Sequence, residues 1–420
     1  MLSRVLNPGV RFISPWTEGL WTPPHTQGPR FDNIPSDPAS VLLIGCGAVG
    51  SVVAHHLASS EVIADVVLAD VDADLAKKTA SRLRRPNVRA MQLDASDPRA
   101  LAEATRGCRL VINTALPRFN RGIQEVALEA GLDYLDPAND MDPFASADRW
   151  VDQGRTAICG MGEDPGLSNV FARYAADGMD RVDSIKVRDG DTASSPEHPF
   201  IALFSPETFI EETLASSRIW TDGRYETVPP FGAFETYEFP PPLGPLPVYS
   251  VDHEEVDTLP GFIGKGVRYV DFKLALDATT VQTLKLFRDL RLLERGPPGG
   301  PSPRKALFAA LPKPVDLAGH VDGFAAVLVE VTGEKDGHRV THSLYSILGH
   351  REASERFGAT ATAYLTGTGA TVGAILLASG VIKKPGMFSP EQLDPKLFFP
   401  LLKEWGIEVR ERITQERDLA

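Results

Sequence analysis

The sequence predicts an α/β protein in which a Rossmann-type parallel sheet domain precedes a second α+β domain with an antiparallel sheet. Two observations predict the first domain. Strand-like and helix-like segments alternate from Ser40 to Cys159, and the first strand runs directly into a glycine-rich turn. The second domain is predicted by a change after about residue 162, where strand-like segments are mixed with proline-rich loops. The 420 residues are enough for both domains.

Residues 1–38, ahead of the first strand, are rich in proline, glycine and polar side chains, with Trp16, Trp21 and Phe31 scattered among them. They show no periodicity. We therefore expect an N-terminal arm whose aromatic side chains pack on the body of the chain or on a partner subunit.

The segments of the first domain follow one another as βαβ units do. We expect strands at residues 41–44, 66–70, 88–94, 110–113, 134–136 and 156–159, and helices at residues 49–59, 74–84, 98–105 and 122–130. This order is typical of a parallel sheet with right-handed crossovers, and we expect the domain to cover residues 39–160.

The turn after the first strand has the G-x-G-x-x-G spacing, with glycines at Gly45, Gly47 and Gly50. Gly45 permits a tight turn, Gly47 lets backbone N–H groups approach a pyrophosphate, and Gly50 lets the helix lie close to the strand. Together with Ala48 and Val49, at the start of the helix, they form the expected binding site for a dinucleotide. A glycine turn without a ligand is the alternative.

Three polar residues end the next strands, at the sheet edge where ligands bind. Asp70 lies twenty residues past Gly50, where its carboxylate can accept both ribose hydroxyls and repel a 2′-phosphate, so we expect NAD rather than NADP. Asp94 is expected on the adenine side, and Asn113 at a ribose or the carboxamide. A loop-start aspartate and a turn-capping asparagine remain equally good interpretations of these two.

The second domain is expected to cover residues 161–355 and to bind the substrate and form the dimer. Its strands are expected at residues 182–187, 268–276, 325–331 and 339–347, with proline-rich loops at residues 228–247 and 296–303.

Residues 356–420 are expected to form C-terminal helices that return to the first domain. Residues 359–382 carry no charge and are long enough to cross a bilayer, but threonine, serine and glycine interrupt them. We therefore expect a buried core helix, covered by the first domain or by a second subunit, and no membrane span. Residues 397–405 are expected to form an amphipathic segment before a polar end.

Composition excludes several other classes of protein. The chain is 43% hydrophobic, and its net charge of −13, without a block of Lys or Arg, argues against a nucleic-acid or anionic membrane partner. Cys46, Cys108 and Cys159 form no C-x-x-C pair, and no signal-peptide pattern precedes them. We expect a cytoplasmic protein without disulfides.

Candidate chemistry in the second domain centres on His253-Glu254-Glu255, where a proton carrier stands among carboxylates. An imidazole suits proton transfer to or from an amine, and a carboxylate can hold a substrate ammonium, so we expect His253 and Glu254 to be catalytic. A solvated acidic loop is the alternative. The other histidines are dispersed, and no metal site is expected.

The segment from Gly162 to Asn169 joins the two domains and contains a Pro165-Gly166 turn. We expect Asp164, Pro165 and Gly166 to line the substrate side of the interdomain cleft. A plain linker turn is the alternative.

Several motifs together resemble the saccharopine dehydrogenase-like oxidoreductases, most closely those of the lysine 6-dehydrogenase type. Carboxynorspermidine and homospermidine synthases are more distant relatives. The resemblance runs from about Ser40 to about Val409, and its motifs are residues 41–50, 68–72, 92–97, 111–113, 119–120, 160–169, 249–259, 361–364 and 386–391.

The resemblance implies a dimeric enzyme that performs NAD(P)-dependent chemistry at an amine-bearing carbon. It places Asn120 and the neighbouring Arg118 on the substrate side, although Arg118 departs from the pattern of the relatives. We expect an NAD-dependent oxidoreductase that acts on the C–N bond of an amino acid or related amine, by a lysine 6-dehydrogenase-like or saccharopine-type route. The alternatives are an opine- or polyamine-type synthase that works by reductive condensation, and a non-catalytic nucleotide-sensing protein.

Overall fold

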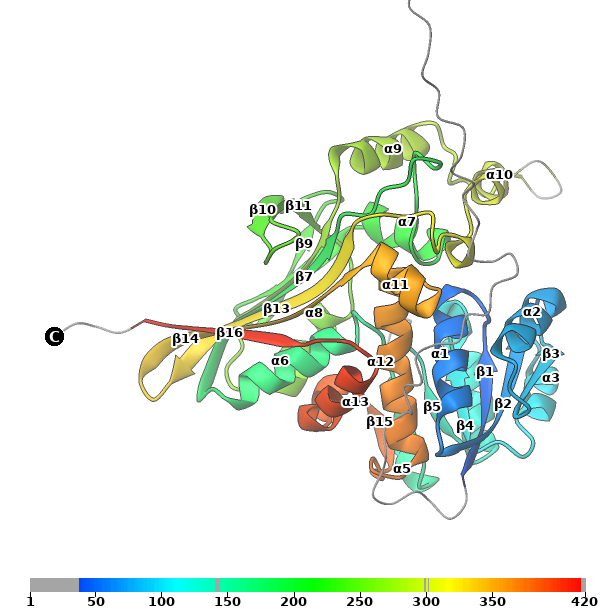
Figure 1. Cartoon of the computed structure of the whole chain (residues 1–420). Coiled ribbons are helices and arrows are strands. Elements are labelled where there is room, and N and C mark those ends of the chain that lie inside the picture. Colours follow the sequence, from blue (N-terminus) through cyan, green and yellow to red (C-terminus); the bar gives the residue numbers. More distant parts are fainter. Residues whose placement is uncertain (1–37, 140–143, 298–299, 301, 417–420) are drawn as a thin grey trace, which may run out of the picture.

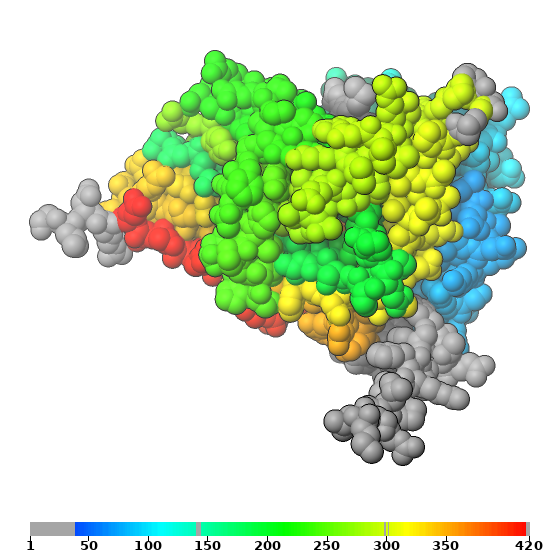
Figure 2. Space-filling view, turned by 90° about the horizontal axis from the view of Figure 1, so that it is seen from above, coloured from blue at the N-terminus to red at the C-terminus, as the bar shows by residue number. Residues whose placement is uncertain are grey.

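The computed structural model describes residues 38–139, 144–297, 300 and 302–416. Within this part of the chain, a parallel sheet with helices on both faces stands beside a second, larger sheet (Figure 1). Seen from above, the yellow residues of the second domain adjoin the blue residues of the first (Figure 2). The aromatic side chains of the expected arm lie outside the described residues.

The parallel sheet has seven strands in the described chain, in the order β15-β6-β5-β4-β1-β2-β3. The expected Rossmann-type parallel sheet is therefore confirmed. Its strands are β1 (Ala39–Ile44), β2 (Ile63–Asp70), β3 (Val88–Gln92), β4 (Leu110–Asn113), β5 (Asp133–Leu135), β6 (Thr156–Ile158) and β15 (Gly386–Phe388). Its helices are α1 (Ala48–Ser59), α2 (Ala73–Leu83), α3 (Pro98–Ala104), η1 (Pro117–Phe119), α4 (Asn120–Glu129) and α5 (Ala147–Asp152).

The turn between β1 and α1 requires glycine at two positions. Gly45 has a φ of +94°, and a Cβ atom on Gly50 would lie 1.9 Å from the Gly45 carbonyl oxygen. The parallel register pairs Ile44 with both Ala69 and Asn113, so the ends of β1, β2 and β4 meet at one edge of the sheet.

The second sheet has nine strands within the described residues. Seven run in the order β10-β11-β12-β7-β13-β14-β16, and the hairpin of β8 and β9 pairs with β12. They are β7 (Arg181–Asp191), β8 (Ser217–Thr221), β9 (Arg224–Val228), β10 (Glu235–Glu238), β11 (Pro245–Ser250), β12 (Tyr269–Ala275), β13 (Phe324–Lys335), β14 (His338–Gly349) and β16 (Arg410–Gln415). Because β12 runs parallel to β7, the sheet is mixed, although its other pairings are antiparallel.

Two expectations about this sheet are wrong. The expected loop at residues 228–247 contains β10 and the start of β11. Pro245 and Pro247 are tolerated in β11 because they are two residues apart, so both missing N–H groups fall on one side of the strand. The end of the chain, expected to belong to C-terminal helices that return to the first domain, instead forms β16, which pairs with β14 of the second sheet.

Helices cover the second sheet and connect it to the first. They are α6 (Leu167–Asp177), α7 (Pro206–Leu214), α8 (Glu255–Ile263), α9 (Ala278–Asp289), α10 (Pro303–Ala310), α11 (His350–Phe357), α12 (Ala361–Ala378) and α13 (Phe398–Glu404), with the short turns η2 (Pro314–Asp316), η3 (Pro390–Gln392) and η4 (Pro395–Leu397). Helix α6 packs on β13, while α9 and α10 lie at the far end of the molecule from α13 (Figure 1).

Helix α12 is the charge-free helix that the sequence predicts, and the prediction of a buried core helix is confirmed. It is the one described helix long and apolar enough to cross a membrane, and 89% of that stretch is buried in this fold. It lies beside α1 (Figure 1). A Cβ atom on Gly367 would lie 2.7 Å from the Cβ atom of Val52, and one on Gly369 would lie 2.2 Å from the Gly162 oxygen. The small side chains therefore allow this close packing.

Candidate active site

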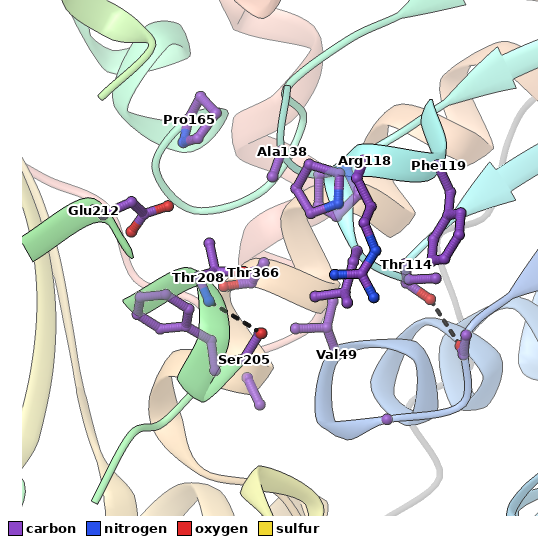
Figure 3. A pocket seen from close by; sticks show the side chains of 18 of the residues that line it. Val49, Thr114, Arg118, Phe119, Ala138, Pro165, Ser205, Thr208, Glu212 and Thr366 are labelled. Atoms are coloured by element: carbon purple, nitrogen blue, oxygen red, sulfur yellow. Dashed lines mark hydrogen bonds between the residues drawn. The ribbon is translucent and has the colours of Figure 1, made fainter. Parts of the chain in front are cut away.

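A cavity of about 490 Å³ lies between the two sheets. At one end it is lined by the β1–α1 turn and the end of β2, and at the other by residues of β7, α7 and the segment before α8. Figure 3 shows Arg118 and Glu212 reaching into this space from opposite sides. Both expected halves of a site, for nucleotide and for substrate, thus border one cavity.

The nucleotide end has the features that a dinucleotide requires. Gly47 is the N-cap of α1 and provides no side-chain cap, and a Cβ atom on it would meet nothing within 4 Å. Gly45, Gly47 and Val49 line the cavity. The free backbone N–H groups at the start of α1 therefore border open space, where a phosphate could bind. Gly50 packs against Gly45 behind the lining. Ala48 lies in the first turn of α1, outside the lining residues.

Asp70 borders the same end of the cavity. Its carboxylate accepts hydrogen bonds from the backbone N–H of Cys46 at 2.7 Å and of Asp72 at 2.9 Å. These bonds fix the carboxylate beside the glycine turn, where it can accept further bonds from ribose hydroxyls. This end of the cavity therefore fits an adenosine dinucleotide.

The remaining predicted cofactor and substrate residues of the first domain divide into two groups. Asp94 lines the cavity, but it also accepts bonds from the Ser96 hydroxyl and N–H, which lower the pKa of its carboxyl group. Asn113 and Asn120 lie outside the lining and bond to each other. Asn113 also accepts from the N–H of Ala115, and Asn120 donates to the Ala138 carbonyl. The structure therefore does not bring these two amides to the cavity, and the turn-capping interpretation fits Asn113.

Carboxyl groups from four separate segments line the opposite end of the cavity, which we call the acidic end: Asp164, Asp189, Glu212 and Glu254. Burial, with Asp191 nearby, raises the pKa of Asp189 to about 8. Burial also raises the pKa of Glu212 to about 8, and burial together with Asp189 raises that of Asp164 well above its usual range. One carboxylate oxygen of Asp164 is buried without a hydrogen-bond partner. A bound cation would relieve this crowding of like charge.

His253 stands at the acidic end with its ring stacked on Phe272, the ring centroids 3.7 Å apart. Its Nδ1 lies 2.5 Å from the Glu255 carboxylate and 3.5 Å from that of Glu254. Burial alone would lower the pKa of His253, but Glu255, Glu254 and Glu212 together raise it well above its usual value. These carboxylates therefore favour the protonated imidazole, and because Nδ1 contacts Glu255, Nε2 is the ring nitrogen available to a substrate.

The side chains of His253, Glu254 and Glu255 lie close enough to be considered as a metal site, since their ligand atoms are within 4.8 Å of one another. Two ligands of one ion, each bonded at about 2.0–2.2 Å, normally lie farther apart than the 2.5 Å contact between His253 and Glu255. We therefore interpret the group as hydrogen-bonded.

Arg118 is the one Arg or Lys in the described lining of the cavity. It extends from η1 and pairs with Glu207 of α7 at 3.0 Å, and its side chain is 56% exposed. Arg304 pairs with the same carboxylate at 2.7 Å. Glu207 would therefore keep a cationic partner if Arg118 turned toward a bound anion.

The interdomain segment reaches the cavity only in part. Asp164 and Pro165, joined by a cis peptide bond, are in the lining. Gly166 is the N-cap of α6 with a φ of +136°, and a Cβ atom on it would lie 2.2 Å from the Gly162 oxygen. The role of Gly166 is thus to bend the chain into α6, behind the two residues that face the cavity.

Four residues of the site were not predicted as site residues: Asp189, Glu212, Glu255 and Phe272. Glu255 belongs to the predicted cluster, but only the fold shows that it, and not Glu254, makes the short contact with His253. Neither Asp189 nor Glu212 lies in a local sequence pattern that marks a site. They come from a strand and a helix, β7 and α7, and only the fold places both at the cavity.

Comparison with known proteins relates both halves of the chain to one family. Residues 41–158 match the family model of the saccharopine dehydrogenase NADP binding domain, and residues 162–408 match that of the saccharopine dehydrogenase C-terminal domain. The chain is 31% identical over 388 residues to carboxyaminopropylagmatine dehydrogenase of Synechocystis, covering 88% of this chain and 96% of that protein. It is 30% identical over 402 residues to carboxynorspermidine synthase of Vibrio cholerae, covering 88% and 95%.

The fold matches a solved structure of the same family. Saccharopine dehydrogenase (L-Glu forming) from Saccharomyces cerevisiae superposes with a TM-score of 0.69 at 17% identity, over 90% of this chain and all of that chain.

Proposed function

The chain belongs to the saccharopine dehydrogenase family of NAD(P)-binding oxidoreductases, and we propose that it joins an amine to a carboxylate-bearing carbonyl compound by reductive condensation. The observation that carries this proposal is the charge distribution of the cavity. Among the described residues that line the cavity, Arg118 is the one Arg or Lys, and the acidic end lies across the cavity from it. A cavity of this kind suits two substrates of opposite charge.

The acidic end is proposed to bind the amine. Burial, together with neighbouring carboxylates, raises the pKa values of Asp164, Asp189 and Glu212, and an ammonium or guanidinium group would lower these values by pairing with the ionised forms. A diamine or guanidino-amine can place its distal cation there and keep its other nitrogen free to react.

Arg118 is proposed to bind the carboxylate of the carbonyl substrate. A guanidinium presents two parallel N–H donors to a carboxylate, which fixes the orientation of the bound group. Because Arg304 also pairs with Glu207, Arg118 can exchange its partner without leaving Glu207 unpaired.

His253 is proposed to supply protons. The neutral amine adds to the carbonyl carbon to give a carbinolamine, and a proton from His253 Nε2 lets its hydroxyl leave as water. The iminium that remains keeps its N–H, so one hydride on its carbon yields the secondary amine, and His253 regains its proton from solvent. A nicotinamide cofactor bound at Gly45, Gly47 and Asp70 would supply the hydride. We propose NAD(H), because the Asp70 carboxylate would repel a 2′-phosphate.

The names of the relatives support a polyamine-type compound over an amino acid such as lysine, and the name synthase of one of them supports condensation. Carboxyaminopropylagmatine and carboxynorspermidine are both carboxylated polyamine-type compounds. They combine the two charges that the cavity is built to accept.

The test is an assay of NADH consumption with aspartate semialdehyde, the aldehyde that supplies a carboxyaminopropyl group, and a panel of diamines and agmatine. We expect consumption only when the aldehyde and an amine are both present. Reduction of NAD⁺ by lysine alone would favour the lysine 6-dehydrogenase-like route. Cofactor binding without turnover on the whole panel would favour the nucleotide-sensing alternative.

A further inference from the structure

A buried hydrogen-bonded network extends behind His253, away from the cavity. Glu255 is 0% exposed, and both of its carboxylate oxygens are used. Oε2 contacts His253 Nδ1 at 2.5 Å, and Oε1 accepts from the hydroxyl of Ser168 at 2.7 Å. Glu255 does not line the cavity and so cannot hold the substrate directly.

The network continues into two other segments of the chain. Ser168 and Asn169 lie in the first turn of α6, where the side-chain amide oxygen (Oδ1) of Asn169 accepts from the N–H of Gly166. The Asn169 amide donates to Glu391 at 2.9 Å, and Glu391 also accepts from the hydroxyl of Ser389. Ser168, Asn169 and Glu391 are each 0% exposed. The network thus joins the His253 loop, the start of α6 and the returning C-terminal segment.

We propose that Glu255 is a positioning residue, which directs the Nδ1–H of His253 away from the cavity and stabilises the protonated ring, and that Ser168 holds Glu255 in this orientation. This inference rests on the proposed role of His253 as proton donor. An imidazole whose Nδ1–H is bound to a carboxylate presents Nε2 to the substrate in one fixed direction. The Phe272 ring, stacked on the imidazole, fixes its plane.

The charges around His253 define the expected pH dependence. Glu254 and Glu255 face it from its own segment, Glu212 from α7, Asp189 from β7 and Asp164 from the interdomain segment. All five are acidic, but Glu255 lies closer to His253 Nδ1 than Glu254 does and is fully buried. Removing its charge should therefore lower the pKa of His253 while the other four carboxyl groups remain.

The test is the Glu255→Gln variant, which keeps the side-chain shape and removes the charge. We expect kcat for the reductive reaction to fall at least about tenfold, the scale of a weakened general acid. The alkaline limb of its pH profile should also move to lower pH. Glu255→Asp, which keeps the charge, should leave that limb closer to its original pH. Asp257→Asn is the matched control, because Asp257 is on the same helix but pairs with Arg218, and it should leave the profile unchanged.

A second measurement does not depend on substrate. In protein labelled with ¹³C-histidine, the resonance missing from His253→Gln identifies His253, and its titration can be followed in the full chain. We expect this titration to move to lower pH in Glu255→Gln and, by a smaller amount, in Ser168→Ala. An unmoved titration in both variants would overturn the proposal. If the His253 titration shifts in Glu255→Gln but the unaltered protein condenses none of the substrates, the inference about Glu255 stands and the proposed function is rejected.

Discussion

At the scale of single residues, Asp70 determines the choice of cofactor in this account. We expect NADH to be preferred over NADPH by at least about tenfold in kcat/KM, because a carboxylate beside a 2′-phosphate is unfavourable. Asp70→Ala should narrow the ratio, whereas Asp74→Ala, which removes an exposed carboxylate on α2, should not. Steady-state kinetics with both cofactors measure this. Equal use of NADH and NADPH by the unaltered protein would contradict the assignment.

The second prediction at this scale concerns Arg118. Arg118→Ala should raise KM for the carbonyl substrate about tenfold or more, with a smaller effect on KM for the amine, because a charge-assisted pair with the carboxylate is lost. Arg121→Ala removes an exposed cation from the adjacent turn of α4 and is the matched control. The assignment fails if the two KM values rise together, or if neither changes.

Asp189 and Glu212 predict how amine binding depends on pH. Their pKa values of about 8 mean that both carboxyl groups are largely protonated at pH 7 and ionise as the pH rises through 8. Since only the ionised forms pair with a cation, kcat/KM for the amine should rise over this range. It should fall again when His253 loses its proton.

Variants of these two residues test the assignment of the rising limb. Asp189→Asn and Glu212→Gln should each flatten it. Glu211→Gln, which alters the neighbouring exposed carboxylate paired with Arg304, should preserve it. A rising limb that survives in both Asp189→Asn and Glu212→Gln would assign it to another group.

Site residues that belong to a local sequence pattern could be predicted, whereas residues placed by contacts between distant segments could not. Gly45, Gly50 and Asp70 could be found because a turn and a strand end have local sequence patterns. Asn113 was also placed correctly at the end of a strand, but its side chain points into a bond with Asn120 that no spacing indicates. Asp189 on β7 and Glu212 on α7 line one cavity only because the fold brings both elements to it, so sequence alone could not pair them.

At the scale of elements, the close contact of α12 with the interdomain segment can be tested by a pair of glycine substitutions. Gly369→Ala should destabilise the protein by about 1–3 kcal/mol, because the new methyl group meets the backbone oxygen of Gly162. Gly122→Ala, in the exposed part of α4 with nothing within 4 Å, should be neutral or stabilising by up to about 1 kcal/mol. Denaturant unfolding measures both. Equal stability of the two variants would refute the packing.

The elements themselves were predictable where periodicity was strong. The six N-terminal strands and α1 to α4 lie close to their predicted positions because alternating buried strands and amphipathic helices are clear in the sequence. Strands β8, β9, β10, β11, β15 and β16 were not predicted, and β10, β11 and β16 were missed for a physical reason. Proline and polar residues are poor strand formers, and it is pairing with neighbours distant in sequence that orders them here.

At the scale of the whole molecule, we predict a homodimer. The argument from α12 no longer supports it, since the chain itself buries that helix. Within the described residues, the support is the edge strand β16, on which Ile413 is 56% exposed, because unpaired edge groups favour pairing with another chain. Light scattering should give twice the chain mass of 45.5 kDa, and Ile413→Lys should shift the protein toward monomer. A mass of 45.5 kDa for the unaltered protein would contradict the prediction.

The central claim is that the enzyme forms a C–N bond between two substrates by reduction. Mass spectrometry of the product formed from aspartate semialdehyde, agmatine and NADH deuterated at the transferable position tests it most directly. We predict one product whose mass equals both substrates minus water, plus one deuterium and one hydrogen, with the deuterium on the former aldehyde carbon. Deuterium recovered only in an alcohol formed from the aldehyde, with the amine unchanged, would contradict the account.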